Sequence, residues 1–553
     1  IEKSSTIKFE SHINAISNII TAIKIYMNTM IKASKLEGKK RNNAIAIETS
    51  LFTMAFNYKK AKNEFGYISM VYPVYIKHDI FTSTNSSYLL FQSSTGSGKT
   101  RCAPFFFSSR IVFEGYKRPF FIMTQPSTAI AKMKSIDLKP IIKDGALIIT
   151  SIEKMIGEYV NPTQSKPIIG IFSPINLLKI ISRTEELKID IFTKTRFCLD
   201  EIHERTIETD ALLAKLSTEM KRRMNFEEQI LLMSATPDEK VKRCFGRVEE
   251  ISITDTTLFD VEVESKKIAF PKDAPTSVSE SIFQIIQRIS KNKNEHGHIL
   301  CFLPGNQMII EVMNQVNNMF KDDPNYVALN NNFIEENDRC EDVFIKLRTE
   351  VESNEDKIII FPIKLAGFVP PEQKKVAQNP LPDNLDNKII KIICATNAVE
   401  SSITIQNLVA VIDSGLHNLP LNDIEKGITE LKLEPITKKM QIQRKGRVGR
   451  TRPGISVQIT LKDNELPENI PPSILTSDLS KSIISLRGAG IKLEELKGLP
   501  DDPGRFKFLT TIKELKVLKV IDNEGNLTEF GKETTQFQNI SPSYSSAILE
   551  TRS

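Results

Sequence analysis

The chain has 553 residues. Because single hydrophobic cores stop growing near about 250–300 residues, three or four domains are expected. Hydrophobic residues make up 40% and charged residues 26% of the chain, and no run approaches the roughly 18 apolar residues of a membrane span, which argues against a membrane protein. The formal net charge of +6 permits nucleic-acid binding without requiring it.

The first segment, residues 1–66, is predicted to be a helical extension. Between residues 9 and 33, apolar side chains recur at spacings of three and four, which is typical of a long helix that packs on a neighbouring domain. The basic stretch "KLEGKKRNN" at residues 35–43 then breaks this pattern and reads as a solvated loop.

Short apolar runs alternate with polar helical stretches over residues 67–248, and the same texture repeats over residues 249–462. Runs of 4–8 apolar residues bounded by polar or turn residues are typical of buried parallel strands. The sequence therefore predicts two tandem α/β domains with parallel sheets. The predicted strands are "YLLFQS", "FFIMTQ", "ALIITS", "PIIGIFS", "RFCLDE" and "QILLMSAT" in the first, and "HILCFLPG", "KIIIFPI", "KIICATN", "VAVIDSG" and "SVQITL" in the second.

Beyond residue 462 the strand-like runs stop and helical patterns take over. We expect a small helical domain over residues 463–528. A further helical domain is expected to begin at residues 529–553.

The stretch "SSTGSGKT", Ser93 to Thr100, follows an apolar strand and precedes a potential helix, which is the context of a phosphate loop. Small residues let backbone N–H groups converge on phosphate oxygens, Lys99 supplies a positive charge, and Thr100 offers a hydroxyl to Mg²⁺. The first glycine of the usual pattern is replaced by Ser93.

The stretch "RFCLDEIHER" supplies the acidic partners that a phosphate loop needs. Asp200 and Glu201 follow an apolar strand, so they are predicted at the carboxyl edge of the sheet, where open α/β sheets bind ligands. Asp200 would hold Mg²⁺, and Glu201 would act as the base. Thr100, Asp200 and Glu201 are thus the predicted metal site.

Six stretches in order resemble the motifs of superfamily 2 helicases, and "DEIH" is similar to the form found in the DEAH/RHA group of RNA helicases. These stretches are "SSTGSGKT", "DEIH", "LLMSATPD", "ILCFLPGNQ", "CATNAVESSITI" and "QRKGRVGRTRPG". The resemblance implies two tandem RecA-like domains over residues 67–248 and 249–462, a winged-helix domain over 463–528 and the start of a ratchet-like domain over 529–553. It also implies a β-hairpin within residues 416–440.

The resemblance further implies roles for single residues. Arg447 and Arg450 match arginines that reach the γ-phosphate, and their spacing would place both on one helix face. Gln443 matches a residue that helps to position water, and Ser234 and Thr236 match the link between nucleotide and nucleic acid. The expected catalytic set is Lys99, Asp200, Glu201, His203, Gln443, Arg447 and Arg450. The expected nucleotide-binding set is Ser93, Ser94, Thr95, Gly96, Ser97, Gly98, Lys99, Thr100 and Asp413.

RNA contacts are expected on loops that face away from the nucleotide, mostly to phosphates. The matching positions are Thr124, Gln125, Ser173, Gly305, Thr396, Asn397 and Ser402. Ser127 and Thr128 stand where the family often has arginines.

Gln378 stands where many family members have a phenylalanine that stacks on the base of the nucleotide. ATP is the expected cofactor with Mg²⁺, and because this phenylalanine is replaced, other NTPs are expected to be accepted.

These features and the resemblance together predict an NTP-driven RNA helicase or ribonucleoprotein remodeller that acts on single-stranded or partly duplex RNA. The resemblance implies that it moves 3′ to 5′. Two alternatives stay open, a helicase-like RNA-binding scaffold with weak turnover and a DNA helicase. Protein activators or a replication or transcription complex are the expected partners, with no membrane. Scattered cysteines without a CxxC pair fit an intracellular location, cytoplasmic or nuclear. Lys445 and Val448 resemble viral members, which adds a viral or protist origin, and for a viral protein packaging in the virion, as a hypothesis.

Overall fold

The computed structural model describes residues 56–57, 67–68, 88–93, 100, 120–142, 146–162, 167–223, 230–234, 238–246, 248–253, 259–291, 296–335, 337–366, 370–396, 405–423, 426, 428–449, 452–462, 465–537 and 540–551. The chain divides into two compact units. The first holds Ile1–Thr256, Ile424–Ile428 and Pro471–Ser553, and the second holds Thr257–Asp423 and Thr429–Ile470. Most of the predicted N-terminal extension lies outside the described residues, apart from β1 (Phe56–Asn57), which pairs antiparallel with β2 (Tyr67–Ile68).

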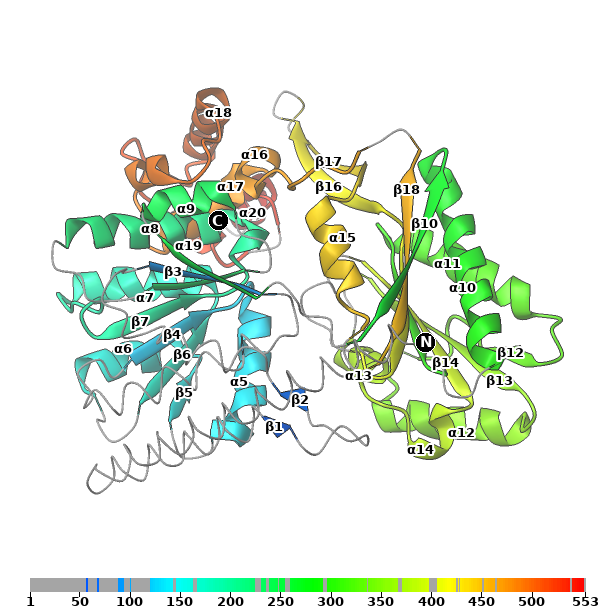
Figure 1. Ribbon diagram of the computed structural model, residues 1–553. Coiled ribbons are helices and arrows are strands. Elements are labelled where there is room, and N and C mark those ends of the chain that lie inside the picture. Colours follow the sequence, from blue (N-terminus) through cyan, green and yellow to red (C-terminus); the bar gives the residue numbers. More distant parts are fainter. Residues whose placement is uncertain are drawn as a thin grey trace, which may run out of the picture. The chain divides into compact units, whose positions relative to one another are not determined.

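The first unit contains a seven-stranded sheet in the order β5-β6-β4-β7-β8-β3-β9, whose neighbouring strands pair in parallel (Figure 1). The strands of this sheet are β3 (Tyr88–Ser93), β4 (Phe120–Thr124), β5 (Leu147–Ile149), β6 (Ile168–Phe172), β7 (Thr195–Leu199), β8 (Ile230–Ser234) and β9 (Glu249–Ile253). Strands β4, β6, β7 and β8 are fully buried, as parallel strands covered on both faces must be, whereas the edge strands β5 and β9 are partly exposed.

Helices cover both faces of this sheet. In Figure 1, α6, α7 and α8 lie along one side of the sheet and α5 lies on the other. This division follows from right-handed crossovers, because the connection from β4 to β5 runs in the opposite direction to the next three. The helices are α5 (Thr128–Ile142), α6 (Ile152–Val160), α7 (Pro174–Glu186), α8 (Ile207–Arg222) and α9 (Glu239–Phe245).

The second unit repeats the architecture with a seven-stranded sheet in the order β10-β18-β15-β11-β14-β13-β12. Neighbouring residues of β11 feed two different cores, as the two-residue period of a strand requires. Ile299 and Cys301 belong to the core under α10 and α11, whereas Leu300 and Phe302 belong to the core under α12 and α13. The strands are β10 (Val261–Ile268), β11 (His298–Phe302), β12 (Tyr326–Ala328), β13 (Ile358–Leu365), β14 (Ile389–Ala395), β15 (Leu408–Asp413) and β18 (Gly454–Leu461).

The helices of the second unit follow its strands, and a separate two-stranded sheet, β16 (Leu416–Asp423) with β17 (Ile428–Pro435), confirms the hairpin expected between the last two motifs. The helices are α10 (Ala274–Lys291), α11 (Asn306–Phe320), α12 (Cys340–Ser353), α13 (Pro371–Gln378), α14 (Asp383–Asp386) and α15 (Lys438–Lys445). Two parallel α/β sheets in tandem are the architecture that the sequence predicts.

The described residues after 470 are mainly helical and belong to the first unit. Leu479, Ile483 and Leu515 share one hydrophobic core with α7 and α8, so this C-terminal segment is packed on the first sheet's helices. A single bridge joins Ile521 to Leu527. The assignment of this C-terminal segment to a winged-helix domain and the start of a ratchet-like domain stays a prediction. Its helices are α16 (Ser473–Thr476), α17 (Leu479–Gly488), α18 (Arg505–Val517), α19 (Glu529–Thr534) and α20 (Pro542–Glu550).

In the two seven-stranded sheets, three strands were not predicted from the sequence. β10 has partly exposed side chains, half of them charged, at the edge of its sheet, β12 has three residues, and β9 continues the first sheet beyond the predicted boundary at residue 248. Apolar runs identify buried central strands well, whereas short or solvated edge strands lack such runs. Among the described residues, no helix is both long and apolar enough to cross a membrane.

Candidate nucleotide site

Strand order alone brings the sequence-predicted residues of the first unit together. β7 lies between β4 and β8, and β3 follows β8, so the segments that leave the carboxyl ends of these four strands are neighbours. Thr100 follows β3, Gln125 follows β4, Asp200 follows β7 and Ser234 ends β8. This edge is where open α/β sheets bind their ligands.

Asp200 is the centre of the site. Its side chain is buried, and its Oδ2 accepts hydrogen bonds from the Thr100 hydroxyl at 2.6 Å and from Gln125 Nε2 at 3.0 Å. Its Oδ1 accepts from the backbone N–H of Glu201 at 3.0 Å. Two motifs that are 100 residues apart in sequence thus meet through one carboxylate.

The Thr100 and Asp200 oxygens suit Mg²⁺, which prefers hard oxygen ligands and usually takes only one or two from the protein beside water and phosphate. No group of three or more His, Cys, Asp or Glu that could hold a metal occurs in the described part of the chain. A site that leaves most coordination positions to phosphate and water is therefore the kind that these residues can build.

Glu201 begins a sharp turn directly after β7. Its φ of 53° is in the left-handed region, which is uncommon for a residue with a side chain, and the turn runs on into the short 3₁₀ helix Ile202–Glu204. His203 Nδ1 lies 3.4 Å from Glu201 Oε2 and 3.4 Å from the Ser234 hydroxyl. The turn places the candidate base beside a histidine that also contacts the end of β8.

Several predicted residues lie outside the described residues, and their roles stay predictions. In the phosphate loop these are Ser94, Thr95, Gly96, Ser97, Gly98 and Lys99. Elsewhere they are Thr236, Asn397, Ser402 and Arg450. Ser93 is described as the last residue of β3.

The predicted RNA-contacting residues of the first unit are largely buried. Thr124 and Gln125 are each 2% exposed and Ser173 is 3% exposed. The Ser173 hydroxyl lies 3.1 Å from that of Thr128, an exposed residue to which Asn176 Nδ2 also donates at 3.3 Å. The polar surface at this point is therefore formed by Thr128 and Asn176, which the sequence analysis did not select.

In the second unit, Gly305 is the N-cap of α11 and Thr396 follows β14. α15 ends at Lys445 with Gly446 as its C-cap, so the expectation that Arg447 and Arg450 share a helix face is wrong. Gln443 is on the last turn of α15, and Arg447 lies in the turn after it and is buried. Glycine has a low helix propensity, which disfavours continuing the helix beyond Gly446.

Asp413 ends β15 in a buried ion pair. Its Oδ1 accepts from Arg444 at 2.6 Å and from the backbone N–H of Gly415 at 2.9 Å. Arg444 is fully buried, and its guanidinium lies 5.0 Å from the centre of the Phe302 ring. Asp413 Oδ2 is buried and has no hydrogen-bond partner within the described part of the chain. The pair fixes α15 on the sheet, and Arg444 was missed because nothing in "QRKGR" separates it from its neighbours.

A second buried charge cluster lies directly after the candidate base. Arg205 donates to both carboxylate oxygens of Asp210, to Asp238 at 2.5 Å and to Asp501 of the C-terminal segment at 2.5 Å, and Lys240 also pairs with Asp501. Burial raises the pKa of Asp501, but the bonds from Lys240 and Arg205 outweigh it, so that this pKa lies below its usual value. For Asp210 burial prevails, and its pKa is raised.

Replacing Arg205 by alanine is expected to destabilise the first unit by roughly 3–5 kcal/mol, because three carboxylates would lose their shared cation. The measurement is the free energy of unfolding from urea titration. Arg222→Ala is the matched control, since Arg222 is 73% exposed in a pair with Glu219 and should cost about 1 kcal/mol or less. Equal effects of the two substitutions would contradict the role given to the cluster.

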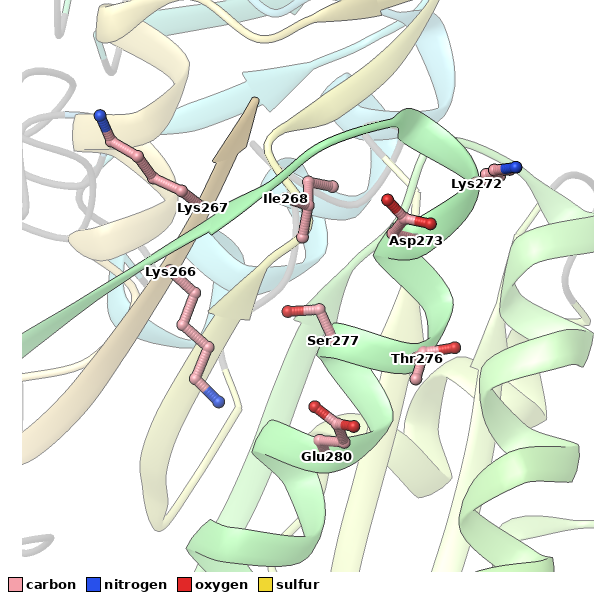
Figure 2. A pocket seen from close by; sticks show the side chains of 8 residues that line it. All are labelled: Lys266, Lys267, Ile268, Lys272, Asp273, Thr276, Ser277 and Glu280. Atoms are coloured by element: carbon pink, nitrogen blue, oxygen red, sulfur yellow. The ribbon is translucent and has the colours of Figure 1, made fainter. Parts of the chain in front are cut away.

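A separate depression of about 620 Å³ lies where β10 ends and α10 begins, and it contains none of the motif residues (Figure 2). Lysines and carboxylates both line it, and Asp273 also accepts from the backbone N–H of Phe270 at 3.0 Å. No ligand chemistry follows from this mixture. The lining residues are Lys266, Lys267, Ile268, Lys272, Asp273, Thr276, Ser277 and Glu280.

The two tandem parallel α/β sheets have the architecture of the RecA-like class of nucleotide-binding folds. The first sheet carries a hydroxyl, two carboxylates and a histidine at its carboxyl edge, where open α/β sheets bind ligands. Residues 75–244 match the family model of the DEAD/DEAH box helicase, so the chain carries a DEAD/DEAH box helicase domain. This is the family of the first α/β unit.

One further protein is similar in sequence, and two solved structures are similar in fold. The chain is 27% identical over 336 residues to a Schizosaccharomyces pombe protein named as a pre-mRNA-splicing factor ATP-dependent RNA helicase, covering 60% of this chain and 45% of that protein. The crystal structure of the Escherichia coli DEAH/RHA helicase HrpB matches with a TM-score of 0.60 at 19% identity, covering 86% of this chain and 53% of that one. A structure described as the E. coli DExH-box NTPase HrpB gives a TM-score of 0.60 at 20% identity, with 86% and 52% covered. The chain spans about half the length of these relatives.

Proposed function

We propose that this protein is an ATP-dependent RNA helicase that also accepts other NTPs and uses their hydrolysis to move along RNA. The observation that carries the proposal is the contact of Thr100 with Asp200, next to Glu201, at the carboxyl edge of a DEAD/DEAH box helicase domain. Phosphoryl transfer needs a phosphate-binding loop, a metal-holding carboxylate and a group that orients water, and this edge offers candidates for all three.

Within this proposal, Thr100 and Asp200 hold the magnesium, which supplies charge neutralisation on the β- and γ-phosphates when bound. Glu201 accepts the proton of the attacking water. Its left-handed backbone turns the side chain away from the strand direction, and His203 keeps it in place from 3.4 Å. Lys99 would contact the phosphates, and Gln443, Arg447 and Arg450 would approach the γ-phosphate from the second unit.

His203 and Ser234 are the proposed route from nucleotide to RNA. Their contact at 3.4 Å joins the turn that carries the candidate base to the last residue of β8. A change at the γ-phosphate that moves Glu201 would therefore also displace the segment after β8. The sequence predicts the coupling residue Thr236 in that segment. Differential contacts of this kind are what a ligand needs to shift a conformational equilibrium.

The proposed nucleic acid is RNA with 3′ to 5′ movement, and proteins are expected as further partners. The fission yeast relative is named as a splicing factor, which favours ribonucleoprotein remodelling and a nuclear location. A DNA helicase stays the alternative, because contacts to phosphates do not distinguish the two sugars.

The test is strand separation by the full chain with ATP, using duplexes whose single-stranded loading tail is RNA or DNA and lies 3′ or 5′. The proposal predicts separation of the duplex with a 3′ RNA tail. Separation with DNA tails alone would favour the DNA helicase, and ATP hydrolysis without separation on any substrate would favour the scaffold with weak turnover.

A further inference from the structure

We propose that Gln125 is a positioning residue for the magnesium carboxylate and not an RNA ligand. Gln125 follows β4, in a segment where the sequence predicts contact with RNA. Its Nε2 instead donates to Asp200 Oδ2 at 3.0 Å and to the backbone oxygen of Thr124 at 2.9 Å. An amide NH₂ has two protons, so both are committed inside the protein.

Burial and backbone anchoring argue against a second orientation. Gln125 is only 2% exposed, and its backbone N–H donates to the Phe172 oxygen at 2.8 Å. A contact with an RNA phosphate would require the side chain to leave Asp200 and expose a buried carboxylate oxygen. Losing a hydrogen bond to a buried charged group is costly, so this exchange is disfavoured.

Gln125 becomes most important when the metal binds. The Thr100 hydroxyl, which now donates to Asp200 Oδ2, is the hydroxyl that a phosphate loop offers to magnesium. Once Thr100 turns to the metal, the bonds from Gln125 and from the backbone N–H of Glu201 still orient the Asp200 carboxylate. Partners that orient a metal-ligating carboxylate in this way tune the affinity of the site.

The position of Gln125 also makes it a link between two surfaces. The backbone oxygen of Phe172 accepts a hydrogen bond from the backbone N–H of Gln125. Phe172 directly precedes Ser173, whose hydroxyl contacts the hydroxyl of Thr128. Thr128 is exposed and Asn176 is half-buried, whereas Gln125 is buried and donates to Asp200. In this inference, the exposed Thr128 is the part of the segment that is open to nucleic acid, and the buried Gln125 serves the metal carboxylate.

The experiment compares Gln125→Met with Thr128→Ala in the full chain. Gln125→Met keeps the length and removes the donor. We expect it to raise the Mg²⁺ concentration needed for binding a fluorescent, non-hydrolysable ATP analogue by about tenfold or more, with affinity for labelled single-stranded RNA within about twofold of wild type in the absence of nucleotide. Thr128→Ala should weaken the affinity for single-stranded RNA and leave the Mg²⁺ requirement for binding the ATP analogue unchanged.

A double-mutant cycle separates positioning from general destabilisation. In an Asp200→Asn background, where the metal-holding carboxylate is gone, Gln125→Met should change the Mg²⁺ requirement by less than about twofold, because its partner has already been removed. An additive loss, or a loss of RNA affinity by Gln125→Met equal to that of Thr128→Ala, would overturn the inference.

This inference rests on the proposed function, and the two can fail separately. If wild-type protein binds the ATP analogue without any dependence on Mg²⁺, the proposed nucleotide site itself fails. If wild type requires Mg²⁺ and Gln125→Met has the same requirement, only the role of Gln125 fails.

Discussion

Replacing Glu201 by glutamine is expected to lower the RNA-stimulated turnover of ATP by about 10²–10⁴-fold, the contribution typical of a positioned general base. Glutamine keeps the size and the turn after β7 but cannot accept the proton from water. Nucleotide affinity should change little, because the phosphate contacts and the Asp200 carboxylate stay in place. The measurement is kcat from steady-state phosphate release, beside the Kd of a non-hydrolysable ATP analogue.

Glu239→Gln is the matched control for this substitution. Glu239 starts α9 in the same unit, and its side chain is 72% exposed in a pair with Lys242. The same chemical change there should leave kcat within about twofold of wild type, because an exposed ion pair contributes little. A Glu201→Gln protein with more than a tenth of the wild-type kcat would contradict the assignment of Glu201 as the base.

Replacing Arg447 by alanine is expected to lower kcat by about 10³–10⁵-fold, the range seen for arginines that stabilise charge on a transferred phosphoryl group. That charge develops in the transition state, so the loss should fall on kcat more than on the affinity for ATP. Arg447 lies just past the glycine that ends α15, and its side chain is buried. The assay is again phosphate release at saturating RNA.

Arg288→Ala provides the comparison in the same unit. Arg288 is on α10, 45% exposed and paired with Glu262 of β10, so its removal should leave kcat within about twofold. If Arg447→Ala retained kcat within tenfold of wild type with an unchanged unfolding temperature, Arg447 would not be a residue that acts on the γ-phosphate.

The sequence predicted the central strands, and it predicted that Asp200 follows one of them, through local pattern. The strands β3, β7 and β8 overlap "YLLFQS", "RFCLDE" and "QILLMSAT", and the segments after them are neighbours at one sheet edge because parallel strands align their carboxyl ends. Such residues can be selected without knowing their neighbours.

The residues that sequence reasoning missed depend on partners far along the chain. Arg205 forms an ion pair with Asp501, which lies 296 residues away in sequence. Gln125 is oriented by its hydrogen bond to Asp200, which lies 75 residues away. The end of α15 at Lys445 was missed for a local reason, since Gly446 alone interrupts a basic run that otherwise looks helical. The periodicity of apolar residues predicts neither contacts between residues far apart in sequence nor helix ends that depend on a single residue.

The most direct test of the account is the rate of ATP hydrolysis by wild type and by Lys99→Ala, each with and without single-stranded RNA. The account predicts a wild-type rate that rises with RNA and a Lys99→Ala rate near background in both conditions, because the phosphates lose the lysine of their loop. A Lys99→Ala protein as active as wild type would contradict the nucleotide site, and a wild-type rate that ignores RNA would contradict the coupling of hydrolysis to RNA.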